Sequence, residues 1–266
     1  MTTSFITTNT IGAGTQFTFT AAGNALVVLP NVTLGSTNGS VINLGGFSDV
    51  EISVLGTLVT TNAVAIASNS SFTLAAGAAF LSFQSSSANS GLNLGLGNNF
   101  VQIDGTLSAP EAIAVLAGNG NNTVNVTGTV TGASGVFLGL FGSSGDILVN
   151  SGSITANAHD DAARDTRYNN AVYVEGPNAR ITNLAGGTLT ATSSEGNGVR
   201  IGASGAGSIV TNHGTITSVN AAGVEFSGLA LGQSATLINT GVISGFDYAF
   251  LAQGVAGLRS SGTAER

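Results

Sequence analysis

The chain lacks cysteine, lysine and tryptophan altogether. Without cysteine it can form neither a disulfide framework nor a thiolate metal site, and this absence fits a protein that matures outside the cytoplasm. Charged residues make up 7% of the sequence, against about a quarter in ordinary globular proteins. The six cations are all arginines and the net charge is −7. The sequence therefore has no basic stripe that would bind nucleic acid or an anionic membrane surface.

Long apolar runs are absent too. No stretch of 18 consecutive apolar residues occurs, so we expect no membrane-spanning helix. Residues Met1–Ile6 contain neither a positively charged region nor an apolar core, so we also expect no cleavable signal peptide. An exported protein of this kind would use a route without such a signal, or this chain would begin after one.

The residues that are abundant point to β-structure. Apolar residues make up 42% of the chain, which excludes a disordered protein despite the low charge. The 39 glycines, with frequent threonine, serine and asparagine, indicate an all-β protein rich in turns. Strong helix formers are scarce, and no apolar stripe of helical period persists along the chain.

A short motif recurs along the chain: Asn-x-Gly, then Thr, Ser or Val, then an apolar residue. It is clearest at Asn150–Ile154, Asn212–Ile216 and Asn239–Ile243. Looser copies, at intervals of 21 to 35 residues, contain the anchor glycines Gly56, Gly77, Gly105, Gly128 and Gly187. A repeat of this period indicates supersecondary units stacked in a row.

Each interval contains three short runs in which apolar residues alternate with small or polar ones, as in a half-buried strand. After Gly187 these runs are 188–191, 198–201 and 208–211. We therefore predict an all-β fold, a right-handed parallel β-helix (β-solenoid) of about nine coils with three short strands each. Residues 1–266 are predicted to form a single domain, with an N-terminal strand or cap segment, a polar loop insertion and an incomplete C-terminal coil at 1–24, 156–170 and 258–266.

The motif, followed about ten residues later by Gly-Val-x-apolar, resembles the β-helical stalks of bacterial exported and surface proteins, namely autotransporter passenger domains and filamentous adhesins. The resemblance covers roughly residues 25–262. It implies an extracellular or cell-surface protein that serves as a rigid spacer or adhesin. No catalytic residue carries over, because the shared positions are structural.

Glycine and asparagine clusters precede the third run of several coils, at Gly95–Asn99, Gly118–Asn122 and Gly142–Asp146. Both residue types accept positive φ, so we expect a repeated tight corner. The clusters also resemble the calcium-binding glycine-rich nonapeptides of exported toxins. Asn99 and Asn122 stand at the aspartate position, however, and a neutral amide lacks the charge that a hard cation needs. We therefore predict plain turns, with no metal and no cofactor.

Catalytic constellations are missing from the sequence. Asp49 and Glu51 are expected to share one solvated strand face. His213 occupies the turn position of its motif, and the only other histidine is His159, so no Ser-His-Asp grouping can be assembled. We predict that the protein is not an enzyme.

The longest interval contains a charged insertion that has no apolar residues to bury, so it should loop out from the stack. Charge is scarce elsewhere, which makes this loop the candidate partner-binding site. Its predicted contact residues are His159, Asp160, Asp161, Arg164, Asp165, Arg167 and Tyr168. The alternative is a solvated loop with weak internal ion pairs.

Two further features bear on function. Thr-x-Thr runs such as Thr129–Thr131 and Thr188–Thr190 predict two outward files of hydroxyl groups, as in ice-binding solenoids, although threonine is also simply a good strand residue. Neither end of the chain has a capping helix, so exposed strand edges could join molecules head to tail.

From these features we predict a non-enzymatic, extracellular structural or adhesive solenoid. Its partners would be other copies of itself, and a surface polysaccharide or host ligand. The alternatives are a carbohydrate-binding or carbohydrate-active β-helix, and third an ice-binding protein.

Overall fold

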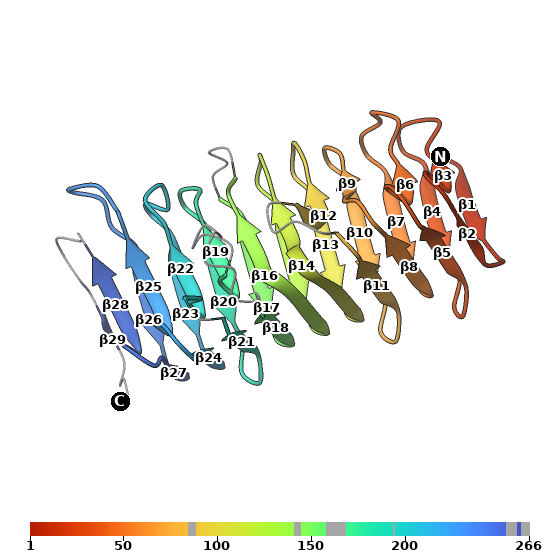
Figure 1. Ribbon diagram of the computed structural model, residues 1–266. Coiled ribbons are helices and arrows are strands. Elements are labelled where there is room, and N and C mark those ends of the chain that lie inside the picture. The colour runs from red at the N-terminus through yellow and green to blue at the C-terminus, as the bar shows by residue number, and fades with distance from the viewer. Residues whose placement is uncertain (85–88, 141–144, 158–168, 194, 254–259, 262–266) are drawn as a thin grey trace.

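The computed structural model describes residues 1–84, 89–140, 145–157, 169–193, 195–253 and 260–261, and these form strands, turns and bends without a helix. Strands pair in parallel with the strand one coil away, as β1 (Thr3–Ile6) does with β4 (Ala25–Val28). Successive coils lie side by side from the N-terminus at one end to the C-terminus at the other (Figure 1). The predicted all-β parallel solenoid of about nine coils, each with three short strands, is confirmed.

The first two faces are sheets whose strands follow one another in chain order. The first face consists of β1, β4, β7 (Glu51–Val54), β10 (Ser71–Leu74), β13 (Phe100–Ile103), β15 (Thr123–Val126), β17 (Ile147–Asn150), β20 (Arg180–Asn183), β23 (Ile209–Asn212), β26 (Thr236–Asn239) and β29 (Ser260–Ser261). The second face consists of β2 (Thr10–Gly12), β5 (Thr33–Ser36), β8 (Thr57–Thr60), β11 (Ala79–Ser82), β14 (Thr106–Ala117), β16 (Thr129–Leu138), β18 (Ser153–Ala156), β21 (Thr188–Ala191), β24 (Thr215–Ser218) and β27 (Val242–Ser244).

The third face completes each coil. The long strands β14 and β16 run from the second face onto the third without a break, so their last residues pair with third-face strands. The other third-face strands are β3 (Phe17–Thr18), β6 (Ile42–Asn43), β9 (Val64–Ile66), β12 (Ser90–Leu94), β19 (Val172–Val174), β22 (Val199–Ile201), β25 (Val224–Ser227) and β28 (Phe250–Gln253). Figure 1 shows this face toward the viewer.

The core is a set of side-chain columns that run along the axis of the solenoid. Alternate residues of each strand point inward, and equivalent positions of successive coils lie in register. On the second face the buried column is Leu34, Leu58, Phe80, Leu107, Val130, Ile154, Leu189 and Ile216. Burying each such side chain contributes roughly 1.5–3 kcal/mol, so the two-residue period of the sequence dictates which side of every strand faces inward.

The anchor glycines are required because the backbone of the preceding coil passes very close to them. A Cβ atom on Gly128 would lie 2.1 Å from the carbonyl oxygen of Gly105, and one on Gly152 would lie 2.1 Å from that of Gly128. Neither distance leaves room for a methyl group, so only glycine fits. At these positions glycine is therefore needed so that neighbouring coils can stack closely, and not because the backbone makes a turn there.

The prediction that Gly77 is an anchor glycine is wrong by one residue. Thr57 pairs with Ala79, so the position equivalent to Gly56 is Ala78 and not Gly77. Gly77 instead has a φ of 80° with no atom near its missing Cβ, which marks an open turn. The next anchor expected from the repeat is Gly262, 21 residues after Gly241, and it lies outside the described residues.

Candidate functional site

The predicted partner loop cannot be placed. All seven of its contact residues, from His159 to Tyr168, lie outside the residues that the structure describes. Within the predicted segment 1–24, strands β1, β2 and β3 form a coil that pairs with β4, β5 and β6. Of the predicted C-terminal coil, 258–259 and 262–266 are outside the described part, while β29 pairs with β26.

The motif asparagines form a buried ladder inside the solenoid. Asn150 Nδ2 donates to Asn183 Oδ1 at 2.8 Å, Asn183 Nδ2 donates to Asn212 Oδ1 at 2.8 Å, and Asn212 Nδ2 donates to Asn239 Oδ1 at 2.7 Å. The first three side chains are fully buried. Each amide also donates to a backbone carbonyl, as Asn183 does to Gly187. The ladder therefore bonds the turn after each strand as well as the asparagine of the next coil. Its role is structural.

A second buried ladder corrects the interpretation of the glycine and asparagine clusters. Asn99 and Asn122 do not have positive φ; Gly97, Gly120 and Gly145 do, one in each cluster, so the predicted corner is present but glycine alone makes it. Asn99 Nδ2 donates to Asn122 Oδ1, and Asn122 Nδ2 donates to Asp146 Oδ1, each at 3.0 Å. The amides point into the solenoid and bond to one another.

Among the described residues no three His, Asp or Glu side chains are grouped so that they could hold a metal ion. Asp49 does not share a strand face with Glu51, because it has a φ of 57° in the turn before β7. His213 is exposed in its turn, as predicted, with Nδ1 2.6 Å from Thr240 Oγ1.

The predicted hydroxyl files are present on the second face. The residue between each pair of hydroxyls is buried, and the hydroxyls themselves point outward. Backbone register aligns five successive coils, which carry Thr106 and Ser108, Thr129 and Thr131, Ser153 and Thr155, Thr188 and Thr190, and Thr215 and Thr217. Parallel strands repeat every ~4.8 Å and alternate residues every ~6.6 Å, so the ten hydroxyls form a regular grid.

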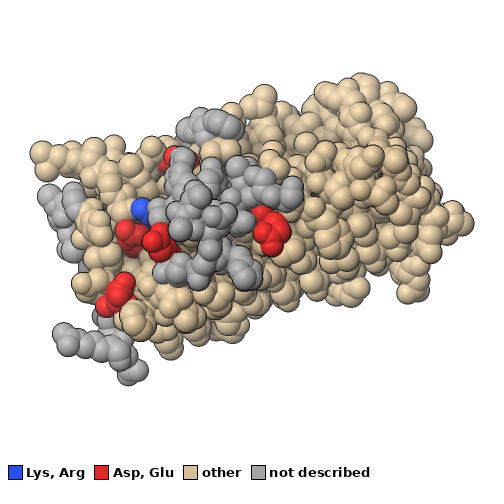
Figure 2. Space-filling view, in the orientation of Figure 1, with Lys and Arg blue, Asp and Glu red and all other residues tan. Residues whose placement is uncertain are grey.

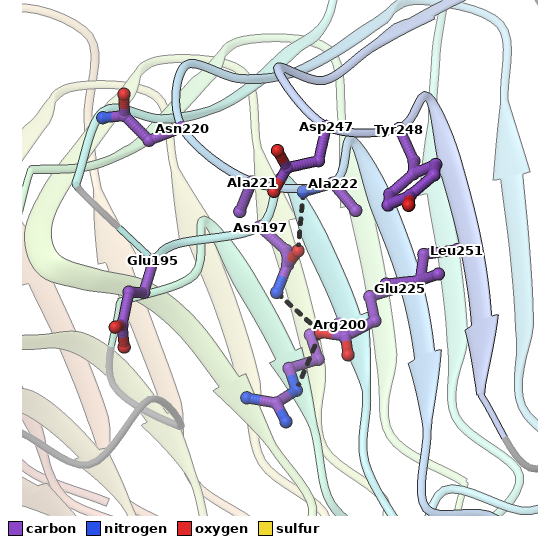
Figure 3. Close-up of a pocket in the computed structure, with 10 residues that line it drawn as sticks. All are labelled: Glu195, Asn197, Arg200, Asn220, Ala221, Ala222, Glu225, Asp247, Tyr248 and Leu251. Atoms are coloured by element: carbon purple, nitrogen blue, oxygen red, sulfur yellow. Dashed lines mark hydrogen bonds and ion pairs between the residues drawn. The ribbon is translucent and has the colours of Figure 1, made fainter.

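A cleft lies at the corner between the second and third faces, near the C-terminal end. We call it the corner cleft; it has a volume of about 320 Å³. Three successive coils supply its walls from their corner turns, and the outward positions of three third-face strands supply the rest (Figure 3). The turns contribute Glu195 and Asn197, then Asn220, Ala221 and Ala222, then Asp247 and Tyr248, and the strands contribute Arg200, Glu225 and Leu251.

One wall of the corner cleft is a fixed hydrogen-bonded network. Glu225 Oε2 accepts from Asn197 Nδ2 at 2.8 Å and lies 3.1 Å from Arg200 Nε. The Arg200 side chain also donates from Nε to Ser227 Oγ at 3.1 Å, and its Cζ lies 6.0 Å from the centroid of the Tyr173 ring. Glu225 is buried despite its charge, and these partners explain how the fold accommodates it.

The charge visible on this side of the molecule lies between its middle and its C-terminal end. In Figure 2 acidic atoms and a small basic patch gather toward that end and a further acidic group lies near the middle, while no charged atom is seen toward the N-terminal end of the same face. Because the chain has so few charged residues, three carboxylates and one guanidinium in a single cleft are a marked concentration.

The corner cleft was not predicted, although the sequence carries a signal for the ion pair in its wall. The third-face run has the form Gly-Val-x-apolar, and x points outward. That position holds Arg200 in β22 and Glu225 in β25, which pair directly across the sheet. Opposite charges at the same outward position of adjacent coils predict an ion pair on that face.

The comparisons with known proteins do not identify the chain. No protein-family model, curated protein or solved structure matches it. The resemblance to bacterial surface stalks therefore stays a prediction. In the described part of the chain no helix exists that could cross a membrane.

Proposed function

We propose that this protein is a non-enzymatic, extracellular structural element, a rigid solenoid rod that serves as a spacer or adhesive stalk. The observation that supports this most directly is the use of its buried polar side chains. They form ladders that join coil to coil, such as that of Asn150, Asn183 and Asn212, instead of converging on a reaction centre. A quasi-one-dimensional stack of this kind resists bending, because each coil is tied to both of its neighbours.

Among the described residues the first sheet ends at β1, whose outer edge offers a place where a second copy could join. Strand β1 is the last strand of its sheet. The carbonyl oxygens of Thr2 and Ile6 accept hydrogen bonds from the backbone N–H groups of Ala25 and Leu29 in the next coil. Successive residues of a strand point alternately toward and away from the neighbouring strand, so the N–H groups of Thr3 and Phe5 point away from β4. An unpaired edge of this kind is a template for another strand. We propose that the opposite end of a neighbouring molecule pairs here, which gives head-to-tail filaments.

Negative-stain microscopy and light scattering over a wide concentration range test this proposal. We expect filaments, and we expect Thr3→Pro to abolish them without loss of stability, because proline removes only an N–H that points outward. The matched variant Ser4→Pro removes a bond to β4 and should instead destabilise the first coil. Monodisperse monomers of the wild-type protein at all concentrations would rule out the assembly.

The hydroxyl grid of the second face supports ice binding as a second candidate function. A flat array of regularly spaced hydroxyls is a surface that can order water. Thermal hysteresis is the direct assay. We expect Thr155→Tyr, at the centre of the grid, to abolish any hysteresis, whereas Thr182→Tyr, at a half-buried outward position of the first face, should leave it unchanged. No hysteresis at millimolar protein would eliminate this function.

A further inference from the structure

In the corner cleft, hydrogen-bond donors and acceptors differ in how many of them are already bonded within the protein. Several of its donors are engaged within the protein: Asn220 Nδ2 donates to Thr192 and Ser193, and Ala222 N donates to Asn197 Oδ1. Asn197 Nδ2 donates to Glu225, and Arg200 is paired with the same carboxylate through its Nε atom. The one cation of the lining is therefore already balanced by a carboxylate of the cleft.

The acceptors of the corner cleft are open by contrast. Among the described residues neither Glu195 nor Asp247 has a hydrogen-bond or ion-pair partner, and Asn220 Oδ1 accepts no bond. Figure 3 shows Asp247 and Tyr248 on the turn at one side of the cleft and Glu195 on the turn at the other. The Tyr248 side chain is 56% exposed, so its ring face is accessible beside these carboxylates.

We propose that the corner cleft binds the guanidinium group of an arginine side chain carried by a peptide. A guanidinium has five N–H donors and no acceptor, which complements the open acceptor oxygens of Glu195, Asp247 and Asn220. Its positive charge complements three carboxylates against one cation. Its planar shape allows bidentate pairing with a carboxylate and stacking on Tyr248.

The remaining lining favours a side chain over a small free cation. Ala221, Ala222 and Leu251 place apolar groups in the corner cleft, next to which the aliphatic stem of arginine can lie. Neutral sugars are a poorer fit, because their hydroxyls need donors as well as acceptors. An anion is excluded by the charge of the lining.

The test is a titration of the full chain with N-acetyl-argininamide, followed by NMR or calorimetry. N-acetyl-citrullinamide, which has nearly the same shape but no charge, is the matched control probe. We expect a dissociation constant on the order of millimolar for the arginine probe, and at least about tenfold weaker binding of the citrulline probe. Binding should weaken as salt is added, because the carboxylates of Glu195 and Asp247 are exposed.

Two variants locate the site. Asp247→Asn should weaken binding of the arginine probe about tenfold, whereas Glu51→Gln, which changes net charge equally on the exposed side of β7, should leave it unchanged. Tyr248→Ala should also weaken binding. Equal binding of the two probes, or equal effects of Asp247→Asn and Glu51→Gln, would overturn the proposal.

Two further probes test the ligand class. Methylguanidine should bind more weakly than the arginine probe, and equal binding would overturn the assignment to a peptide side chain. A neutral disaccharide that binds as tightly as the arginine probe would overturn the preference for a cation. These outcomes are independent of rod and filament formation, which the microscopy tests separately.

Discussion

Removal of one amide from the middle of the asparagine ladder is expected to destabilise the whole solenoid. Asn183 accepts from Asn150 Nδ2 and donates to Asn212 Oδ1, both at 2.8 Å, and it is fully buried. In Asn183→Ala these two bonds are lost, at ~1 kcal/mol each. The variant also leaves the Asn212 carbonyl oxygen buried without its donor, which costs ~1–3 kcal/mol. We therefore expect the free energy of unfolding to fall by about 3–5 kcal/mol.

Asn125→Ala is the matched control for this prediction. Asn125 lies on the same face in β15 but points outward, and it makes no side-chain hydrogen bond among the described residues. Its replacement should change stability by no more than about 0.5 kcal/mol. Urea unfolding followed by circular dichroism measures both variants, and equal slopes are needed because stacked repeats can unfold in parts. The ladder is not a major source of stability if the losses in free energy of unfolding of Asn183→Ala and the control differ by less than about 1 kcal/mol.

Three more predictions follow from the packing. Val126→Thr should be less destabilising than Val124→Thr by about 1 kcal/mol in urea unfolding. Val126 pairs with Asn150, whose buried Oδ1 has no donor among the described residues and could accept a hydrogen bond from the new hydroxyl, whereas Val124 pairs with Leu148. Equal losses would contradict this. Gly128→Ala should lower the free energy of unfolding by about 3 kcal/mol or more, because its Cβ would lie 2.1 Å from a carbonyl oxygen. Gly77→Ala should lower it by only ~1–2 kcal/mol, the strain of an alanine at positive φ. Similar melting temperatures for the two would contradict it. Added calcium should leave the melting temperature unchanged, because the Asn99 and Asn122 amides bond within their ladder; a rise with calcium concentration would show a site.

Much of the fold could be predicted because a solenoid places equivalent residues of successive coils side by side. The alternation in Thr188–Ala191 identified Leu189 as inward and the hydroxyls as outward, and the structure agrees. Prediction failed where equivalence had to be assigned from composition alone. Gly77 was assumed to be an anchor because it is glycine, yet backbone register gives that place to Ala78.

The candidate site was much less predictable. The charged loop around His159–Tyr168 was predicted as the partner site, because charge is rare in this chain and five of its nineteen charged residues lie close together there. The corner cleft instead draws Glu195, Asn220 and Asp247 from three turns more than 20 residues apart in sequence. No local pattern joins these residues, so composition and spacing gave no sign that they share a cleft.

The amino-acid sequence by itself determined the winding. A two-residue apolar period, glycines where backbones touch and asparagines at one recurring position suffice to specify three strands per coil, because each coil meets only its neighbours. Tertiary structure alone decided the rest: that the asparagine amides run in one direction from Asn150, that Asn99 and Asn122 face inward, and that three corner turns enclose a cleft. These features depend on side-chain orientation and on the paths of turns in adjacent coils, which a linear pattern does not encode.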